Sequence, residues 1–137
     1  MADLTIIDEE YTFNGDVIIS QTDTNGIITY ANRAFCRISD YSVNELVGQA
    51  HSIIRHPNMP KVVFTKLWKT ISDAQAWNGL IKNRRKDGKF YWVDTEILPV
   101  LNENKEITGF IAVQKEASRK DIHETQDTYN KMLETQD

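Results

Sequence analysis

The chain has 137 residues, 40% of them hydrophobic, and its 16 basic and 20 acidic side chains give a formal net charge of −4. That length supports one domain with its own core and one extra element, and the acidic balance argues against nucleic acid as the main partner. A single cysteine excludes an intrachain disulfide and fits a reducing compartment. Because no segment is apolar enough to span a bilayer and the N-terminus does not resemble a signal peptide, we expect a cytoplasmic protein without direct membrane insertion.

The first part of the chain predicts a short cap and a β-hairpin. Residues 1–15 are mixed in composition and are expected to form an N-terminal cap that packs weakly on the domain. Residues 16–22 have the composition of a strand, and residues 27–30 have that of a returning strand. Between them lies Asn25-Gly26, a dipeptide typical of tight hairpin turns.

Helices are predicted next. Apolar residues at helical spacing indicate a short helix over residues 31–39. Ser42 followed three residues later by Glu45 is the pattern of a capping box, which predicts a second short helix ending near Gly48. A longer helix is predicted over residues 59–72, where apolar side chains recur along one stripe.

Three strands and a trailing helix complete the chain. The strands are predicted over residues 77–85, 90–101 and 106–115. The trailing helix carries an a/d-like seam formed by Ile122, Thr125, Tyr129 and Met132. Hairpin connections imply an antiparallel sheet, so the fold class is α+β, with a five-stranded antiparallel sheet, short helices on one face and a C-terminal helix. We expect the domain to span residues 16–116, followed by a signalling or linker helix over 117–137.

Residues 53–60, here called the Pro-bracketed segment, hold Arg55, His56 and Asn58 beside two prolines. Proline fixes its own φ and pushes the preceding residue out of the α region, so this backbone is predicted to be stiff and non-helical. Polar side chains held at the entrance of a helix are well placed to contact a ligand. The alternative is a rigid loop in which Asn58 caps the following helix.

A polar side chain is expected on the buried face of the strand over 77–85. Side chains alternate faces along a strand, and the more apolar face carries Trp77, Gly79, Ile81 and Asn83. A buried amide needs hydrogen-bond partners, which a planar ligand or a neighbouring backbone would supply. Gly79 leaves room for a ring or for close packing.

Other polar residues are weaker candidates for a site. The basic run over 82–86 is expected to be mostly a solvated strand face and turn, with one cation able to reach a ligand phosphate. Cys36 is expected to be a small buried hydrophobe. His51 and His56 do not line up on one helix face, and no metal site, nucleophile or acid–base set is visible, so we do not expect an enzyme.

The residues 25–32, 41–48 and 83–93 resemble the corresponding segments of a PAS domain, and the resemblance covers about residues 16–118. A narrower resemblance, in residues 48–61 and 77–86, is to the FAD-binding PAS domain of bacterial aerotaxis receptors. It implies non-covalent FAD binding, and it marks the following candidate cofactor-binding residues: Asn32, Arg55, His56, Asn58, Phe64, Trp68, Trp77 and Asn83. Asn58 stands where the motif of that family has Asp.

The leading hypothesis is a cytoplasmic sensory domain that binds FAD and reports redox state or oxygen for energy taxis. By resemblance, its partner is a chemotaxis transducer or signalling domain, in the same chain or a separate protein, and a homodimer is expected. The reactive-cysteine motif of light-sensing flavin PAS domains is missing, so adduct photochemistry is not expected. The alternatives are a haem-binding oxygen sensor that uses His51 or His56, and a ligand-free PAS dimerisation module.

Overall fold

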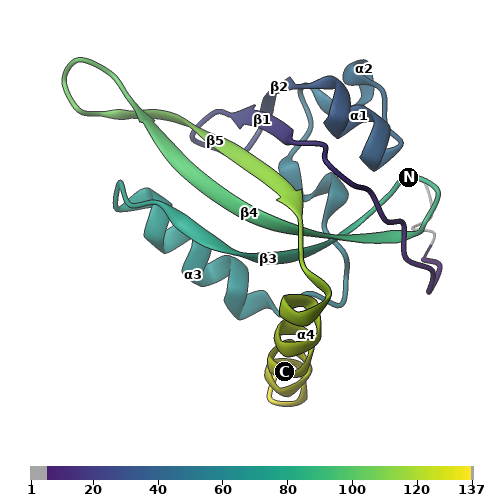
Figure 1. Cartoon of the computed structure of the whole chain (residues 1–137). Coiled ribbons are helices and arrows are strands. Elements are labelled where there is room, and N and C mark those ends of the chain that lie inside the picture. The colour runs from purple at the N-terminus through teal and green to yellow at the C-terminus, as the bar shows by residue number, and fades with distance from the viewer. Residues whose placement is uncertain (1–5, 137) are drawn as a thin grey trace.

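The structure is a computed structural model that describes residues 6–136. Its strands form one antiparallel sheet in the order β2-β1-β5-β4-β3 (Figure 1). They are β1 (Ile18–Thr22), β2 (Ile28–Ala31), β3 (Trp77–Arg84), β4 (Phe90–Leu101) and β5 (Ile107–Glu116). The β1–β2 hairpin joins the three consecutive strands β3 to β5 through the pairing of β1 with β5, in which Ile18 lies opposite Gln114 and Thr22 opposite Phe110. The predicted α+β fold with a five-stranded antiparallel sheet is therefore confirmed.

Within the described residues, four helices connect β2 to β3, and a fifth helix follows the last strand (Figure 1). They are α1 (Arg33–Ser39), α2 (Val43–Leu46), the 3₁₀ helix η1 (His51–Ile54), α3 (Lys61–Ser72) and α4 (Arg119–Glu134). The capping box that begins α2 is present in both directions, between Ser42 and Glu45. This reciprocal pair satisfies two N–H groups that the helix itself leaves free, which explains why a helix of four residues begins where predicted.

The start of α3 differs from the prediction. The helix begins at Lys61 with Pro60 at its N-cap, and Asn58 is exposed and lies outside the cap. The interpretation of Asn58 as the N-cap is therefore wrong. The physical reason is that Pro60 excludes the α region for Met59, so the helix cannot start until after the second proline.

The main core lies between one face of the sheet and helices α1 to α3. The buried stripe of α3 consists of Val63, Leu67 and Ile71. It meets side chains of β3 to β5, and Phe35 and Ile38 of α1 belong to the same core. Helix amphipathicity thus turns the apolar stripe of α3 toward the sheet.

The C-terminal helix α4 packs against the opposite face of the sheet. The ring of Tyr129 stacks on Trp92 with centroids 6.2 Å apart, and its hydroxyl donates a hydrogen bond to the Leu80 carbonyl at 2.6 Å. Ile122 and Tyr129 of the predicted seam are buried. The seam of α4 therefore packs on the domain's own sheet.

The described part of the N-terminal segment runs beside the beginning of β4. The Tyr11 amide donates to the Phe90 carbonyl at 2.7 Å, and Glu10 forms an ion pair with Arg119 at the start of α4. Residues 1–5 of the predicted N-terminal cap lie outside the described residues.

Candidate functional site

A cavity of about 210 Å³ lies between the sheet and α3. Four parts of the chain form its walls: the inner face of the sheet, the β1–β2 turn, the α3 helix, and residues 50–55, which precede α3. The apolar wall of α3 consists of Phe64, Leu67, Trp68 and Ile71. The Trp68 ring meets Phe110 of β5 edge to face, with ring centroids 5.8 Å apart. The wall is thus mainly hydrophobic and aromatic, as is usual for ligand sites.

Gly26 in the β1–β2 turn permits this wall to close. Its φ of +80° lies in the left-handed region, and a Cβ added there would lie 3.0 Å from the Trp68 ring. A larger residue would be strained by its backbone and crowded by the indole. The turn dipeptide therefore serves both the hairpin and the cavity.

Two buried amides supply the unsatisfied polar atoms of the cavity. Asn83 of β3 is 3% exposed and Gln114 of β5 is 2% exposed, and both line the cavity. Nδ2 of Asn83 has no partner at full hydrogen-bond distance, and the buried hydroxyl of its cross-strand neighbour Tyr91 has none either. The two groups interact, because Asn83 opposes the rise that burial causes in the pKa of Tyr91. Nε2 of Gln114 donates to Thr95 Oγ1 at 3.1 Å, which leaves Oε1 of Gln114 without a partner. Two residues that line this apolar cavity thus each carry one buried amide atom without a partner, whereas buried polar atoms are normally paired.

His51 adds a neutral ring to the cavity wall. Its Nε2 lies 3.2 Å from Ser20 Oγ, and its ring stacks on Phe35 with centroids 5.8 Å apart. Burial lowers the pKa of His51 to about 4, with a smaller contribution from the nearby Arg55 cation. Near neutral pH this imidazole is therefore uncharged.

Arg55 is the cationic side chain that lines the cavity, among the described residues. Its guanidinium carbon lies 3.7 Å from the centroid of the Phe64 ring, a geometry that holds the planar group by a cation–π interaction. The residue is exposed, so its N–H donors remain available at the cavity mouth. A guanidinium in this position can bind a phosphate or carboxylate.

The structure brings four of the eight predicted cofactor-binding residues to the cavity: Arg55, Phe64, Trp68 and Asn83. The face alternation predicted for β3 thus holds for its polar member, Asn83. The amide of Asn32 is instead used to begin α1, because its Oδ1 accepts from Phe35 N and its Nδ2 donates to Val17 O, each at 3.0 Å.

His56, Asn58 and Trp77 lie outside the cavity lining as well. The His56 ring is buried, and its Nδ1 accepts a hydrogen bond from the backbone N–H of Asn58 at 3.0 Å. The Trp77 ring lies over Gly79, where an added Cβ would be 2.6 Å from the indole. Gly79 was expected to leave room either for a ring or for close packing. The structure shows close packing, because the indole of Trp77 fills this space.

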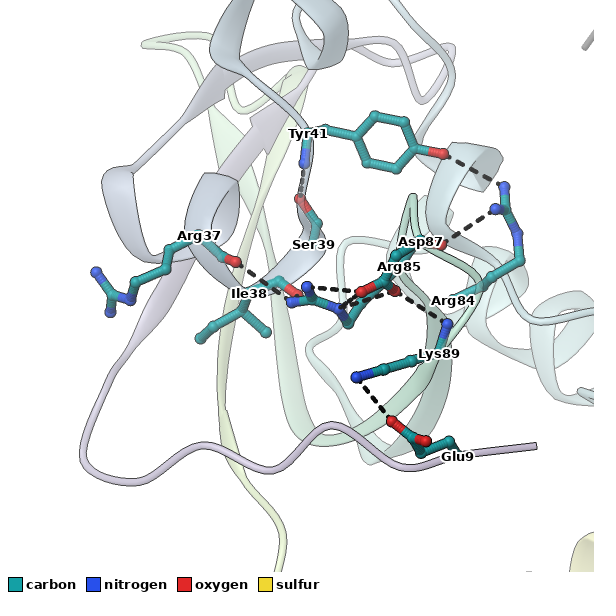
Figure 2. Close-up of polar contacts among 9 residues, drawn as sticks. All are labelled: Glu9, Arg37, Ile38, Ser39, Tyr41, Arg84, Arg85, Asp87 and Lys89. Carbon is teal, nitrogen blue, oxygen red and sulfur yellow. Dashed lines mark hydrogen bonds and ion pairs between the residues drawn. The ribbon is translucent and has the colours of Figure 1, made fainter. Parts of the chain in front are cut away.

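The basic run over 82–86 is less solvated than predicted. Arg84 and Arg85 are each 8% exposed, so the expectation of a solvated strand face is wrong for these two. Arg85 donates to the Ile38 carbonyl at 2.7 Å and pairs with Asp87 at 3.0 Å (Figure 2). Neither arginine lines the cavity, so the cation at its mouth is Arg55 rather than a member of this run.

Sequence reasoning did not single out Gln114 as a site residue, and it considered His51 only as a possible haem ligand. The buried face of β5 carries Phe110, Ala112 and Gln114. A signal for Gln114 was present, because it shares the period-two pattern with Phe110. His51 had no such signal, since its place depends on the contact between η1 and β1.

Comparison with known proteins identifies the family. Residues 28–114 match the family described as PAS fold. The chain belongs to the PAS family. It is 38% identical over 112 residues to the aerotaxis receptor of Escherichia coli (strain K12), a match that covers 82% of this chain and 22% of that protein. It is also 38% identical over 102 residues to the nitrogen fixation regulatory protein of Klebsiella pneumoniae, covering 74% of this chain and 21% of that protein.

The fold agrees with solved PAS structures. The light-state structure of the blue-light photoreceptor Aureochrome1 LOV superimposes with a TM-score of 0.74 at 20% identity, covering 82% of this chain and 91% of that one. This PAS domain spans about a fifth of the length of the two relatives named above. In residues 6–136 no helix is long and apolar enough to cross a membrane, and no cluster of His, Cys, Asp or Glu is arranged to hold a metal.

Proposed function

We propose that this PAS domain is a non-enzymatic sensory module that binds FAD non-covalently and responds to the redox state of its ring. The proposal rests on one observation: the buried amides of Asn83 and Gln114 both line one apolar cavity, and each has an atom without a partner. The edge of a flavin ring offers carbonyl acceptors and an N–H donor, which are the groups that these two amides can pair with after a rotation of their side chains. The resemblance to aerotaxis receptors supports the same cofactor.

The size and charge of the cavity fit the ring and one anionic group. Its volume of about 210 Å³ is below the roughly 300–1,000 Å³ of pockets that enclose drug-sized ligands. It therefore suits the ring system, with the rest of the cofactor passing the mouth beside Arg55. The cation of Arg55 is placed to bind a phosphate there.

Gln114 is suited to respond to a change in protonation at the ring edge. The flavin supplies reversible electron transfer, which changes the donors and acceptors of its edge. Gln114 can rotate its amide so that Nε2 faces the cavity in place of Oε1. Thr95 accepts from Nε2 at 3.1 Å in the present orientation, and a hydroxyl can equally donate to Oε1 after the rotation. Both orientations are therefore satisfied, which makes the side chain a two-state element.

The partner is a chemotaxis transducer or another signalling domain, in the same chain or in a separate cytoplasmic protein. The 38% identity to an aerotaxis receptor supports energy taxis as the process. A homodimer remains a prediction. Because Ile122 and Tyr129 of the α4 seam are buried in the domain itself, a dimer through that seam requires α4 to leave the sheet.

The haem alternative has less support. His56 lies outside the cavity lining, and Nε2 of His51 is already within hydrogen-bond distance of Ser20 Oγ. A histidine ligand to iron needs a free ring nitrogen that faces the metal. The third alternative, a ligand-free module, leaves the two amide atoms at the cavity without a function.

The test is an absorption spectrum of the purified protein, before and after dithionite, with and without added FAD. We expect a flavin spectrum that bleaches on reduction, and about tenfold or greater loss of FAD affinity in Asn83→Leu, because the variant removes a buried donor. Asn78→Leu is the matched control, since Asn78 is an exposed amide on the other face of the same strand. A haem spectrum, or undiminished FAD affinity in Asn83→Leu, would contradict the proposal.

A further inference from the structure

The Pro-bracketed segment lies along β3, which is the edge strand of the sheet. The main chains of Arg55 and Asn83 form an isolated antiparallel bridge. One residue earlier on the strand, the Lys82 amide donates to Met59 Sδ at 3.4 Å. The segment therefore covers an edge whose N–H and C=O groups would otherwise be open.

Arg84, the next residue of β3, adds a side-chain contact to the same segment. Its Nη2 donates to the Ile53 carbonyl at 3.1 Å and to the Tyr41 hydroxyl at 3.4 Å (Figure 2 shows the Tyr41 contact). Its Nη1 donates to the Arg85 carbonyl at 3.2 Å. Three consecutive residues of β3 thus hold the segment, in antiparallel order.

The surroundings of Arg84 are unusual for a buried cation. It is 8% exposed, its hydrogen-bond acceptors are all neutral oxygens, and its Nε has no partner. The neighbouring Arg85, by contrast, is paired with the Asp87 carboxylate (Figure 2). Burial of a charge without a counter-ion is unfavourable for stability, so stability alone does not account for an arginine at this position.

Its contacts fix the orientation of a cavity wall. The bridge at Arg55 and the Lys82–Met59 bond attach the middle and the end of the segment to β3. The bond from Arg84 to the Ile53 carbonyl attaches the beginning of the segment, two residues before Arg55. Ile53 belongs to η1, the element that also carries His51 to the cavity. The beginning of η1 is held by the His51 amide, which donates to the Gly26 carbonyl at 2.9 Å, and Arg84 is the residue of β3 that holds its other end, at Ile53.

We propose that Arg84 is a positioning residue of the cofactor site, an inference that rests on the proposed function. Arg84 does not line the cavity. It holds η1 so that His51 and Arg55 face the Asn83 amide across one ligand. Binding groups supported in this way are pre-organised, and loss of the support weakens binding without removing any group that contacts the ligand.

The test compares Arg84→Met with Arg85→Met, which removes the neighbouring buried arginine but leaves the attachment to Ile53. Two quantities are measured, the FAD dissociation constant and the hydrogen exchange of the Ile53 and Arg55 amides in cofactor-free protein. These amides donate to the carbonyls of Ala50 and Ser52, in and beside η1, so their exchange reports the order of η1 and of the start of the segment. Urea is adjusted so that the two variants have the same global stability.

We expect Arg84→Met to weaken FAD binding about tenfold and to speed exchange of both amides about tenfold, while Arg85→Met at matched stability changes neither by more than about twofold. Equal effects in the two variants, or wild-type affinity and exchange in Arg84→Met, would overturn the inference. If Arg84→Met does not fold, Arg84→Lys keeps the charge but loses the planar fork, and unchanged exchange in that variant overturns it equally. If the wild-type protein binds no FAD, the proposed function fails, and the exchange comparison alone then decides whether Arg84 positions the segment.

Discussion

His51 and His56 are both kept neutral by burial, which lowers the pKa of each imidazole from 6.5 to about 4. Lys82 and Arg84 lower the pKa of His56 further, and Asp8 opposes them. The pKa in the folded chain is thus below the unfolded value for both residues. Between these two values the unfolded chain binds more protons than the folded one, so stability is fully present above about pH 6.5 and falls as the pH drops toward 4.

We therefore expect the free energy of unfolding to decrease between about pH 7 and pH 4, by about 3 kcal/mol at most for each histidine. Replacement of either histidine by glutamine should flatten this dependence, because glutamine has no proton to gain. The pH dependence of the free energy of unfolding is measured by urea unfolding of wild type, His51→Gln and His56→Gln at several pH values. Identical pH slopes in all three proteins would show that other groups, such as carboxylates, cause the loss.

The C-terminal helix shows how tertiary contacts decide the behaviour of a polar element. An isolated helix of this length is marginal in water, and α4 has 16 residues. Its order depends on Tyr129, which stacks on Trp92 and donates to the Leu80 carbonyl. Tyr129 is therefore the α4 side chain that combines a buried ring with a buried hydrogen bond to the sheet.

We expect Tyr129→Ala to release α4 from the sheet with a loss of about 2–4 kcal/mol of docking energy, since it removes a buried aromatic ring and a buried hydrogen bond. Limited proteolysis should then cut within residues 119–134, and helical circular dichroism should fall. Lys131→Ala is the control, because Lys131 is exposed on the same helix. Equal protease resistance in Tyr129→Ala would show that the docking contact is not decisive.

Most of the elements could be predicted because short-range signals define them. The Asn25-Gly26 turn, the Ser42–Glu45 capping box and the long aromatic strand over 90–101 all appear in the structure as expected. Local chemistry is sufficient in these cases. The start of α3 was misplaced because the effect of Pro60 on the preceding residue was stronger than the apolar pattern.

The site was only partly predictable because its contacts join distant parts of the chain. Alternation along one strand placed Asn83 at the cavity. The burial of Arg85, however, depends on the Ile38 carbonyl, 47 residues away in the sequence. The position of the Trp77 ring over Gly79 depends on a side-chain rotamer that no periodicity reveals. Such features require the three-dimensional arrangement.

At the scale of the whole molecule, one strand connects the cavity to the C-terminal helix. Gln114 lies near the end of β5, which ends at Glu116, and α4 begins at Arg119. The inner face of β5 thus contacts the cavity, while α4 packs against the outer face of the sheet at Trp92. Gln114 lies five residues before the first residue of α4. A change in its hydrogen bonds therefore occurs close to this helix in the chain.

We expect reduction of the bound flavin to change the docking of α4, and we expect this change to require Gln114. Allosteric coupling of about 1–3 kcal/mol corresponds to roughly a 5- to 150-fold change in an equilibrium. Amide exchange within residues 119–134 should therefore change at least about fivefold between oxidised and dithionite-reduced protein. In Gln114→Leu, reconstituted with saturating FAD, the two states should exchange alike, because leucine cannot replace an acceptor by a donor. Tyr129→Ala provides the reference for a fully released helix. If Gln114→Leu retained the redox-dependent difference, the signal would pass through another route, and the assignment of Gln114 as the two-state element would be wrong.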